Sequence, residues 1–180
     1  MKLGRTHAAF RACADPGDPA TERSAFTERD AQSGMVTCLP GRPALLVSST
    51  SWTEFEQLTL AGDSLPSLVC VITGSADLGV CLHKSSSGLD LPMKVVDMFG
   101  CCLPVCAVNF QCLHELVKHE ENGLVFEDSE ELAAQLQMLF SKFPDPAGKL
   151  SQFRKNLRES EQLRWDESWT RTVLPLLMDT

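Results

Sequence analysis

The sequence predicts an α/β fold of the doubly wound type, with helices on both faces of a parallel sheet. From residue 43 onward, short apolar runs alternate with helical stretches. The runs are continuously apolar, which is typical of strands buried on both faces of a parallel sheet. A length of 180 residues suits one domain better than two.

The first part of the chain has a different composition. Residues 1–42 are rich in Gly, Pro, Ser and Thr, and their six basic and five acidic residues leave the other 138 residues with a charge of −9. No large apolar residue recurs there at a helical or strand period. We expect a disordered or loosely attached tail over 1–42 and the α/β domain over 43–180.

The expected elements follow from the apolar runs and their punctuation. Pro92 in the first turn and Gly100 after the last turn bound one helix, and Asp128 caps another whose leucines form an apolar stripe. Pro144 and Pro146 follow that helix. The predicted strands are 44–49, 67–73, 76–82, 104–108 and 123–126, and the predicted helices are 53–60, 92–99, 112–117, the Asp128-capped helix, 147–160 and 166–178.

One connection is too short for this topology. Strands 67–73 and 76–82 are separated only by Gly74 and Ser75. Parallel neighbours need a crossover of about a dozen residues or more, so the two strands form a hairpin or one of them leaves the sheet. The spacing indicates that a segment is missing at this point.

Charge and hydropathy exclude two classes of protein. A net charge of −8 and a pI of about 5.0 argue against sequence-independent nucleic-acid binding. The longest uncharged run, 98–113, has 16 residues, fewer than the roughly 20 that span a bilayer. The first residues lead into no apolar core, so we expect neither a signal peptide nor a membrane span in this chain.

The eight cysteines lie mostly inside apolar runs, and buried free thiols are the favoured interpretation. A zinc site is the alternative, but its candidate ligands fit no paired C-x2-C pattern, and we expect no metal. His114 and His119 are five residues apart and fall on different helix faces, unlike a zinc-protease motif. The zinc candidates are Cys101, Cys102, Cys106, Cys112, His114 and His119.

The segment with the clearest chemical potential is Ser85–Leu89, a small hydroxyl-rich loop between a strand and a helix. Its backbone N–H groups and the following helix N-terminus suit a diphosphate. The Asp97 carboxylate could accept hydrogen bonds from two vicinal ribose hydroxyls, and the Lys94 ammonium could contact a phosphate. Residue types alone favour the alternative in which Asp90 is a helix cap and Lys94 and Asp97 lie on a solvated face. They also favour His83 ending a strand over His83 touching a phosphate.

The spacing also matches a known pattern. Pro92-x-Lys94-x-x-Asp97-x4-Cys102-x-Pro104-Val105, followed by Glu115-Leu-Val-x5-Gly123-Leu-Val-Phe126, resembles the donor-binding half of a GT-B glycosyltransferase. The run 88–100, Gly-Leu-Asp-Leu-Pro-Met-Lys-Val-Val-Asp-Met-Phe-Gly, is similar to the chitobiosyldiphosphodolichol β-mannosyltransferase family. Short paralogues of that enzyme are expected to match better still. The resemblance implies an incomplete, Rossmann-like C-terminal donor-binding domain.

The resemblance also implies roles for single residues. Asp97 matches the acid that grips the nucleotide ribose, and Asp90 lies near the acid that contacts the donor sugar. Lys94 matches the basic residue between these acids. The loop that faces the sugar and phosphates matches Ser87, Gly88 and Leu89. No catalytic residue is assigned in this chain, and no metal or other cofactor is implied.

The family transfers mannose from GDP-mannose to a dolichol-linked chitobiose on the cytosolic face of the endoplasmic reticulum. The resemblance thus implies a nucleotide-sugar donor, a dolichol-linked acceptor and a cytoplasmic or endoplasmic-reticulum location. We expect no counterpart here of the family's amino-terminal anchor and acceptor domain, and we expect shorter stretches after 44–49 and after Thr73. We therefore expect no sugar transfer by this chain alone. The alternatives are an inactive paralogue that binds nucleotide weakly or only a protein partner, and docking onto a related full-length transferase.

Overall fold

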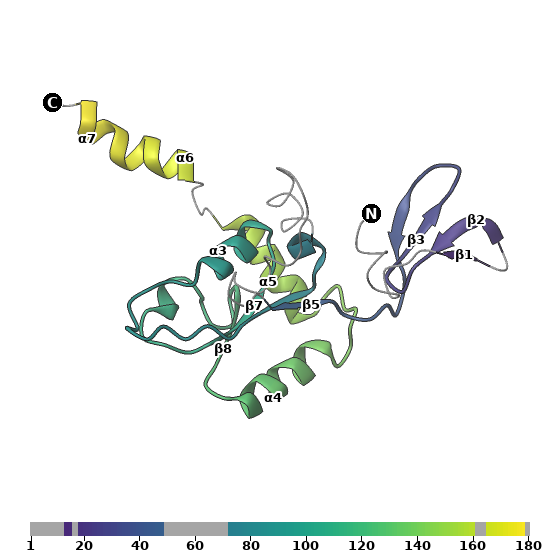
Figure 1. The fold of residues 1–180 in the computed structure, drawn as a ribbon, viewed down its shortest axis with the longest axis horizontal. Coiled ribbons are helices and arrows are strands. Elements are labelled where there is room, and N and C mark those ends of the chain that lie inside the picture. The colour runs from purple at the N-terminus through teal and green to yellow at the C-terminus, as the bar shows by residue number, and fades with distance from the viewer. Residues whose placement is uncertain (1–12, 16–17, 49–71, 161–164, 179–180) are drawn as a thin grey trace, which may run out of the picture.

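The computed structural model describes residues 13–15, 18–48, 72–160 and 165–178. They form two sheets of four strands each (Figure 1). The first sheet is antiparallel and the second is parallel. The strands of the first are β1 (Cys13–Asp15), β2 (Asp18–Arg23), β3 (Thr27–Asp30) and β4 (Val36–Cys38), and those of the second are β5 (Leu46–Ser48), β6 (Leu78–Cys81), β7 (Val105–Val108) and β8 (Gly123–Phe126).

The parallel sheet confirms the predicted α/β fold. Its strands lie in the order β5-β6-β7-β8, with helices on both faces. In Figure 1, α3 (Met93–Gly100) lies on one side of this sheet and α4 (Ser129–Phe140) on the other. Helix α5 (Lys149–Glu159) contributes Leu157 to the core on the α3 side and Leu150 and Phe153 to the core on the α4 side. Strand β8 has the predicted bounds, and β5, β6 and β7 fall inside the predicted ranges.

Alternate side chains of each strand enter separate cores. Val105 and Ala107 of β7 pack with Phe99 of α3, whereas Cys106 between them packs on the opposite face. That second core also holds Leu139 of α4 and residues of α5. Strands β6, β7 and β8 are therefore buried on both faces, which explains why their sequences are continuously apolar, whereas β5 is mostly exposed.

The structure removes the conflict between the predicted strands 67–73 and 76–82, which are only two residues apart. Residues 72–75 are helical, so the predicted strand 67–73 is wrong at Ile72 and Thr73, and its remainder lies outside the described residues. Strand β6 begins only at Leu78 and pairs in parallel with β5. No hairpin forms there among the described residues. The predicted helix 53–60 also lies outside them.

The other helices agree with the sequence with small changes. The Asp128 carboxylate accepts the backbone N–H groups of Glu130 and Glu131 at 3.0 and 2.9 Å, which confirms the predicted cap of α4. The predicted helix 112–117 is only a 3-10 turn, η3 (Leu113–Glu115). The C-terminal helix is divided into α6 (Trp165–Ser168), the π-helical η4 (Trp169–Val173) and α7 (Leu174–Met178).

The described part of 1–42 forms strands, whereas we expected a disordered or loosely attached tail. Strands β1–β4 form a meander whose β3–β4 turn is fixed by Asp30, because its carboxylate accepts the backbone N–H groups of Gln32 and Ser33. Gly34 closes this turn with a φ of +68°. Local turn chemistry thus builds strands without an apolar period. The proposed boundary at residue 42 stays a prediction.

The outer edge of β8 is closed by local groups. Val125 donates its N–H to His119 Nδ1 at 3.0 Å and accepts from Gln135 Nε2 at 2.8 Å. Gly123 accepts the backbone N–H of Glu120 at 2.9 Å. A further strand could pair here only after these bonds broke.

Candidate functional site

The candidate site lies where the parallel strands end. The loop 82–92 follows β6, the segment 109–112 follows β7, and Glu127 follows β8. Because carboxyl ends of parallel strands share one edge, these segments are neighbours there. Asn109 donates a hydrogen bond to the Glu127 carboxylate, and Cys112 N–H donates to the carbonyl of Gly88 at 3.1 Å.

Gly88 shapes the tip of the loop. Its φ is +75°, which favours glycine, and a Cβ added there would lie 3.3 Å from the Cβ of Gln111. Its N–H donates to the Ser85 hydroxyl at 2.8 Å, and Leu89 N–H donates to the Ser87 hydroxyl at 3.3 Å. The predicted loop residues Ser87, Gly88 and Leu89 therefore form one ordered turn.

Asp90 is engaged with its own loop. The Ser85 hydroxyl donates a short hydrogen bond to Asp90 Oδ1, and His83 Nε2 lies 3.2 Å from Asp90 Oδ2. The Ser85 hydroxyl and then His83 hold the pKa of the Asp90 carboxyl below its usual value. This arrangement differs from a helix cap, because α3 begins with Pro92 at its N-cap and has no side-chain cap.

Helix α3 presents the other two predicted residues. Lys94 is half-buried in its first turn, and Asp97 is exposed one turn later. A spacing of three residues puts Lys94 and Asp97 on neighbouring positions of one helix face. The structure thus brings Lys94 to the uncapped N-terminus of α3, directly after the loop.

Sequence reasoning missed two supports of the loop. Gln111 limits the space beside Gly88, and the backbone of Cys112 bonds its carbonyl. The pKa of the Cys112 thiol is raised by burial and by the Glu115 and Asp90 carboxylates. A glycine after three serines was the available signal for a tight turn, but nothing in the sequence identified the residues that contact it.

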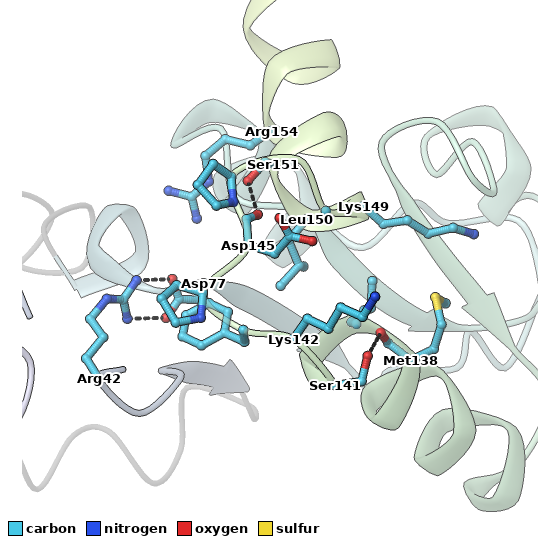
Figure 2. Close-up of a pocket in the computed structure, with 15 residues that line it drawn as sticks. Arg42, Asp77, Met138, Ser141, Lys142, Asp145, Lys149, Leu150, Ser151 and Arg154 are labelled. Atoms are coloured by element: carbon cyan, nitrogen blue, oxygen red, sulfur yellow. Dashed lines mark hydrogen bonds and ion pairs between the residues drawn. The ribbon is translucent and has the colours of Figure 1, made fainter. Parts of the chain in front are cut away.

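Cavities lie on both edges of the sheet. One of about 520 Å³ is at the carboxyl ends of β7 and β8, between Asn109, His119 and Glu131. Another of about 490 Å³ lies at the opposite edge (Figure 2), where Arg42 pairs with Asp77 at 2.6 and 2.7 Å. None of the predicted donor residues lines either cavity.

The opposite edge is built for stability. Arg42 and Asp77 are mostly buried, the Asp77 carboxylate also accepts Leu45 N–H at 2.9 Å, and Arg42 stacks over Phe143 at 5.0 Å. Hydrogen bonding to Asp77 raises the pKa of the Arg42 guanidinium. Figure 2 shows Arg154 nearby, where its guanidinium donates to the carbonyl of Ala76 at 2.7 Å.

The described cysteines are free thiols that differ in burial. Among the described residues, Cys81 and Cys106 are buried free thiols, whereas Cys13 and Cys38 are exposed. Burial raises the pKa of Cys106 to about 12. No group of three or more His, Cys, Asp or Glu side chains in the described ranges could hold a metal ion, and no helix there could cross a bilayer.

Comparison with known proteins identifies the family. The chain is 68% identical to chitobiosyldiphosphodolichol beta-mannosyltransferase of Pongo abelii and 67% identical to that of Homo sapiens, over its whole length. It spans about half the length of these curated relatives. Both alignments are 230 positions long, so at least 50 positions have no residue in this 180-residue chain, which supports the inferred loss of segments.

A shorter relative matches as well. The human protein named "Putative glycosyltransferase ALG1L2" is 63% identical over 79% of this chain and 84% of its own length. Short paralogues were expected to match better than the full-length enzyme, which is wrong for this one. No family model and no solved structure matches. With this identity and coverage, the chain belongs to the chitobiosyldiphosphodolichol beta-mannosyltransferase family.

Proposed function

We propose that the carboxyl-terminal edge of the parallel sheet binds the nucleotide sugar GDP-mannose as the donor of a mannosyl transfer. The observation that carries this proposal is the ordered turn 85–90, held between β6 and the uncapped N-terminus of α3. The start of α3 offers its helix dipole to a diphosphate, and the turn fixes the backbone beside it, with the N–H groups of Gly88 and Leu89 bonded to serine hydroxyls within the loop. Family membership supplies the choice of sugar and nucleotide.

Five of the six predicted residues contact the donor in this proposal. The backbone of Ser87, Gly88 and Leu89 faces the sugar and phosphates. Lys94 neutralises phosphate charge beside the helix N-terminus, in place of a metal ion. Asp97 is exposed and accepts hydrogen bonds from two ribose hydroxyls.

The acceptor belongs to the same proposal. The relatives are named for chitobiosyldiphosphodolichol, a lipid-linked disaccharide. We propose that transfer takes place at the cytosolic face of the endoplasmic reticulum, where donor and acceptor meet. The 180 residues alone are expected to bind donor without transferring mannose, because transfer requires both substrates to be held in reacting geometry.

Docking onto a related full-length transferase is the second candidate function. The closed edge of β8 favours the other edge strand, β5, where Leu46 and Ser48 are exposed. Co-purification of the chain with that enzyme, lost when Leu46 is changed to Lys, would support docking. Absence of co-purification would remove this candidate.

Calorimetric titration of the purified chain with GDP and GDP-mannose tests donor binding. Asp97→Ala should weaken GDP binding about tenfold, because charge-assisted hydrogen bonds to the ribose are lost. The matched control is Glu130→Ala, which removes an exposed carboxylate from the first turn of α4 and should leave affinity unchanged. Equal affinities for the wild type and Asp97→Ala would contradict the ribose role.

A further inference from the structure

A continuous chain of polar contacts runs through the candidate loop. His83 contacts Asp90, Asp90 accepts from the Ser85 hydroxyl, and that hydroxyl accepts the N–H of Gly88. Its members come from the end of β6 and from the residues just before α3. The two ends of the loop are therefore joined through side chains.

Both oxygens of the Asp90 carboxylate are used within the loop. Oδ1 receives the Ser85 hydroxyl and lies 3.5 Å from the Ser87 hydroxyl, and Oδ2 faces His83. Because an ionised carboxylate only accepts hydrogen bonds, His83 must donate from Nε2. Ser85 is 8% exposed, and its hydroxyl lies between the Gly88 N–H and Asp90 Oδ1.

The geometry points to Asp90 as a positioning residue: together with His83, it orients the Ser85 hydroxyl so that the Gly88 backbone keeps its left-handed turn for the donor diphosphate. Asp90 thus acts through the shape of the loop rather than by touching the sugar. The role of this brace in ligand binding rests on the proposed donor site. The brace formed by His83, Ser85 and Asp90 can be measured without any nucleotide.

The turn has a second anchor besides the brace. The Gly88 carbonyl accepts Cys112 N–H at 3.1 Å, which ties the turn to the segment after β7. Gln111 lies against the open side of Gly88. The N–H of Gly88 is held by the brace and its carbonyl by this second anchor, so loss of the brace frees only one side of the turn.

The test measures amide hydrogen exchange at Gly88 and GDP affinity in the same variants. Asp90→Asn and His83→Ala should speed Gly88 exchange about fivefold, since exposed polar contacts of this kind are of modest strength. Both should weaken GDP binding by a similar factor. Ser86→Ala, an exposed neighbour in the loop, and Asp97→Ala should leave Gly88 exchange unchanged.

The outcomes separate this inference from the proposed function. Unchanged Gly88 exchange in Asp90→Asn overturns the brace, whether or not GDP affinity falls, because a fall alone means that Asp90 touches the ligand. Faster exchange in a chain whose wild type binds no GDP supports the brace as a loop-orienting device and overturns donor binding. Folding is checked in each variant by the exchange of core amides such as Leu124.

Discussion

The two sheets of this chain are built in opposite ways. Every strand of the parallel sheet except β5 is buried on both faces, with Leu78 and Val105 fully covered. In the antiparallel sheet, β4 is exposed along its whole length, and Val36 is 58% exposed. Packing stabilises the first sheet, whereas turns and hydrogen bonds shape the second.

The difference determines where a binding site can be precise. A loop keeps its geometry when the elements at its two ends are fixed by packing. The loop 82–92 connects β6 to α3, and both contribute fully buried side chains, Leu78 and Val95. No comparable core lies under the described residues of 13–38.

Replacing one glycine in each sheet by alanine should give the largest difference in stability between the two regions. A Cβ on Gly123 would lie 2.4 Å from the backbone oxygen of Val105, so Gly123→Ala should lower the free energy of unfolding by about 3 kcal/mol. Gly34→Ala meets nothing within 4 Å and should cost about 1 kcal/mol, from its positive φ alone. Urea unfolding of the two variants measures both costs. Equal losses of unfolding free energy in the two variants would show that the parallel sheet is no more tightly packed than the antiparallel sheet.

Valines provide a matched pair with a smaller effect. Val105→Ala removes two fully buried methyl groups and should cost about 2 kcal/mol, including the cavity. Val36→Ala makes the same change on an exposed strand and should cost less than about 0.5 kcal/mol. Thermal unfolding of both variants checks the difference. A large loss for Val36→Ala would mean that the antiparallel sheet has a partner that covers it.

Carboxylates in the two regions give the smallest effect. The pKa of Asp30 is lowered by the backbone N–H and then the hydroxyl of Ser33, and the pKa of Asp90 by Ser85 and then His83. A lowered folded pKa stabilises the fold above the ordinary value of 3.8 and loses that contribution as the pH falls through the folded value. Carboxyl carbon shifts followed by NMR titration should place both groups below 3.8.

Serine variants control this titration. Ser85→Ala should raise the pKa of Asp90 and leave that of Asp30 unchanged. Ser33→Ala should raise the pKa of Asp30 and leave that of Asp90 unchanged. If both variants shifted both carboxyl groups, the two regions would be coupled rather than independent.

The sequence predicted the fold best where apolar runs are buried on both faces. Strand β8 and the Asp128 cap are correct because each depends on adjacent residues. The prediction failed at Ile72 and Thr73, since an apolar run alone does not distinguish a strand from a helix. It also failed in 13–38, where turn residues rather than periodicity make the strands.

The candidate site was predictable in outline only. The motif located the loop, Lys94 and Asp97. The contact of His83 with Asp90 depends on how far the loop folds back, and the contact of Cys112 with Gly88 joins residues that follow different strands. Contacts of this kind are set by tertiary packing, so no local pattern reports them.

The most direct test of the donor site is an NMR titration of the isotope-labelled chain with GDP. Donor binding at the carboxyl-terminal edge predicts saturable amide shifts at residues 85–97 and at Gln111 and Cys112, with none at residues 18–38. Shifts that instead gather around Arg42 and Lys142, at the cavity in Figure 2, would contradict that placement. The absence of any shift at millimolar GDP would contradict nucleotide binding itself.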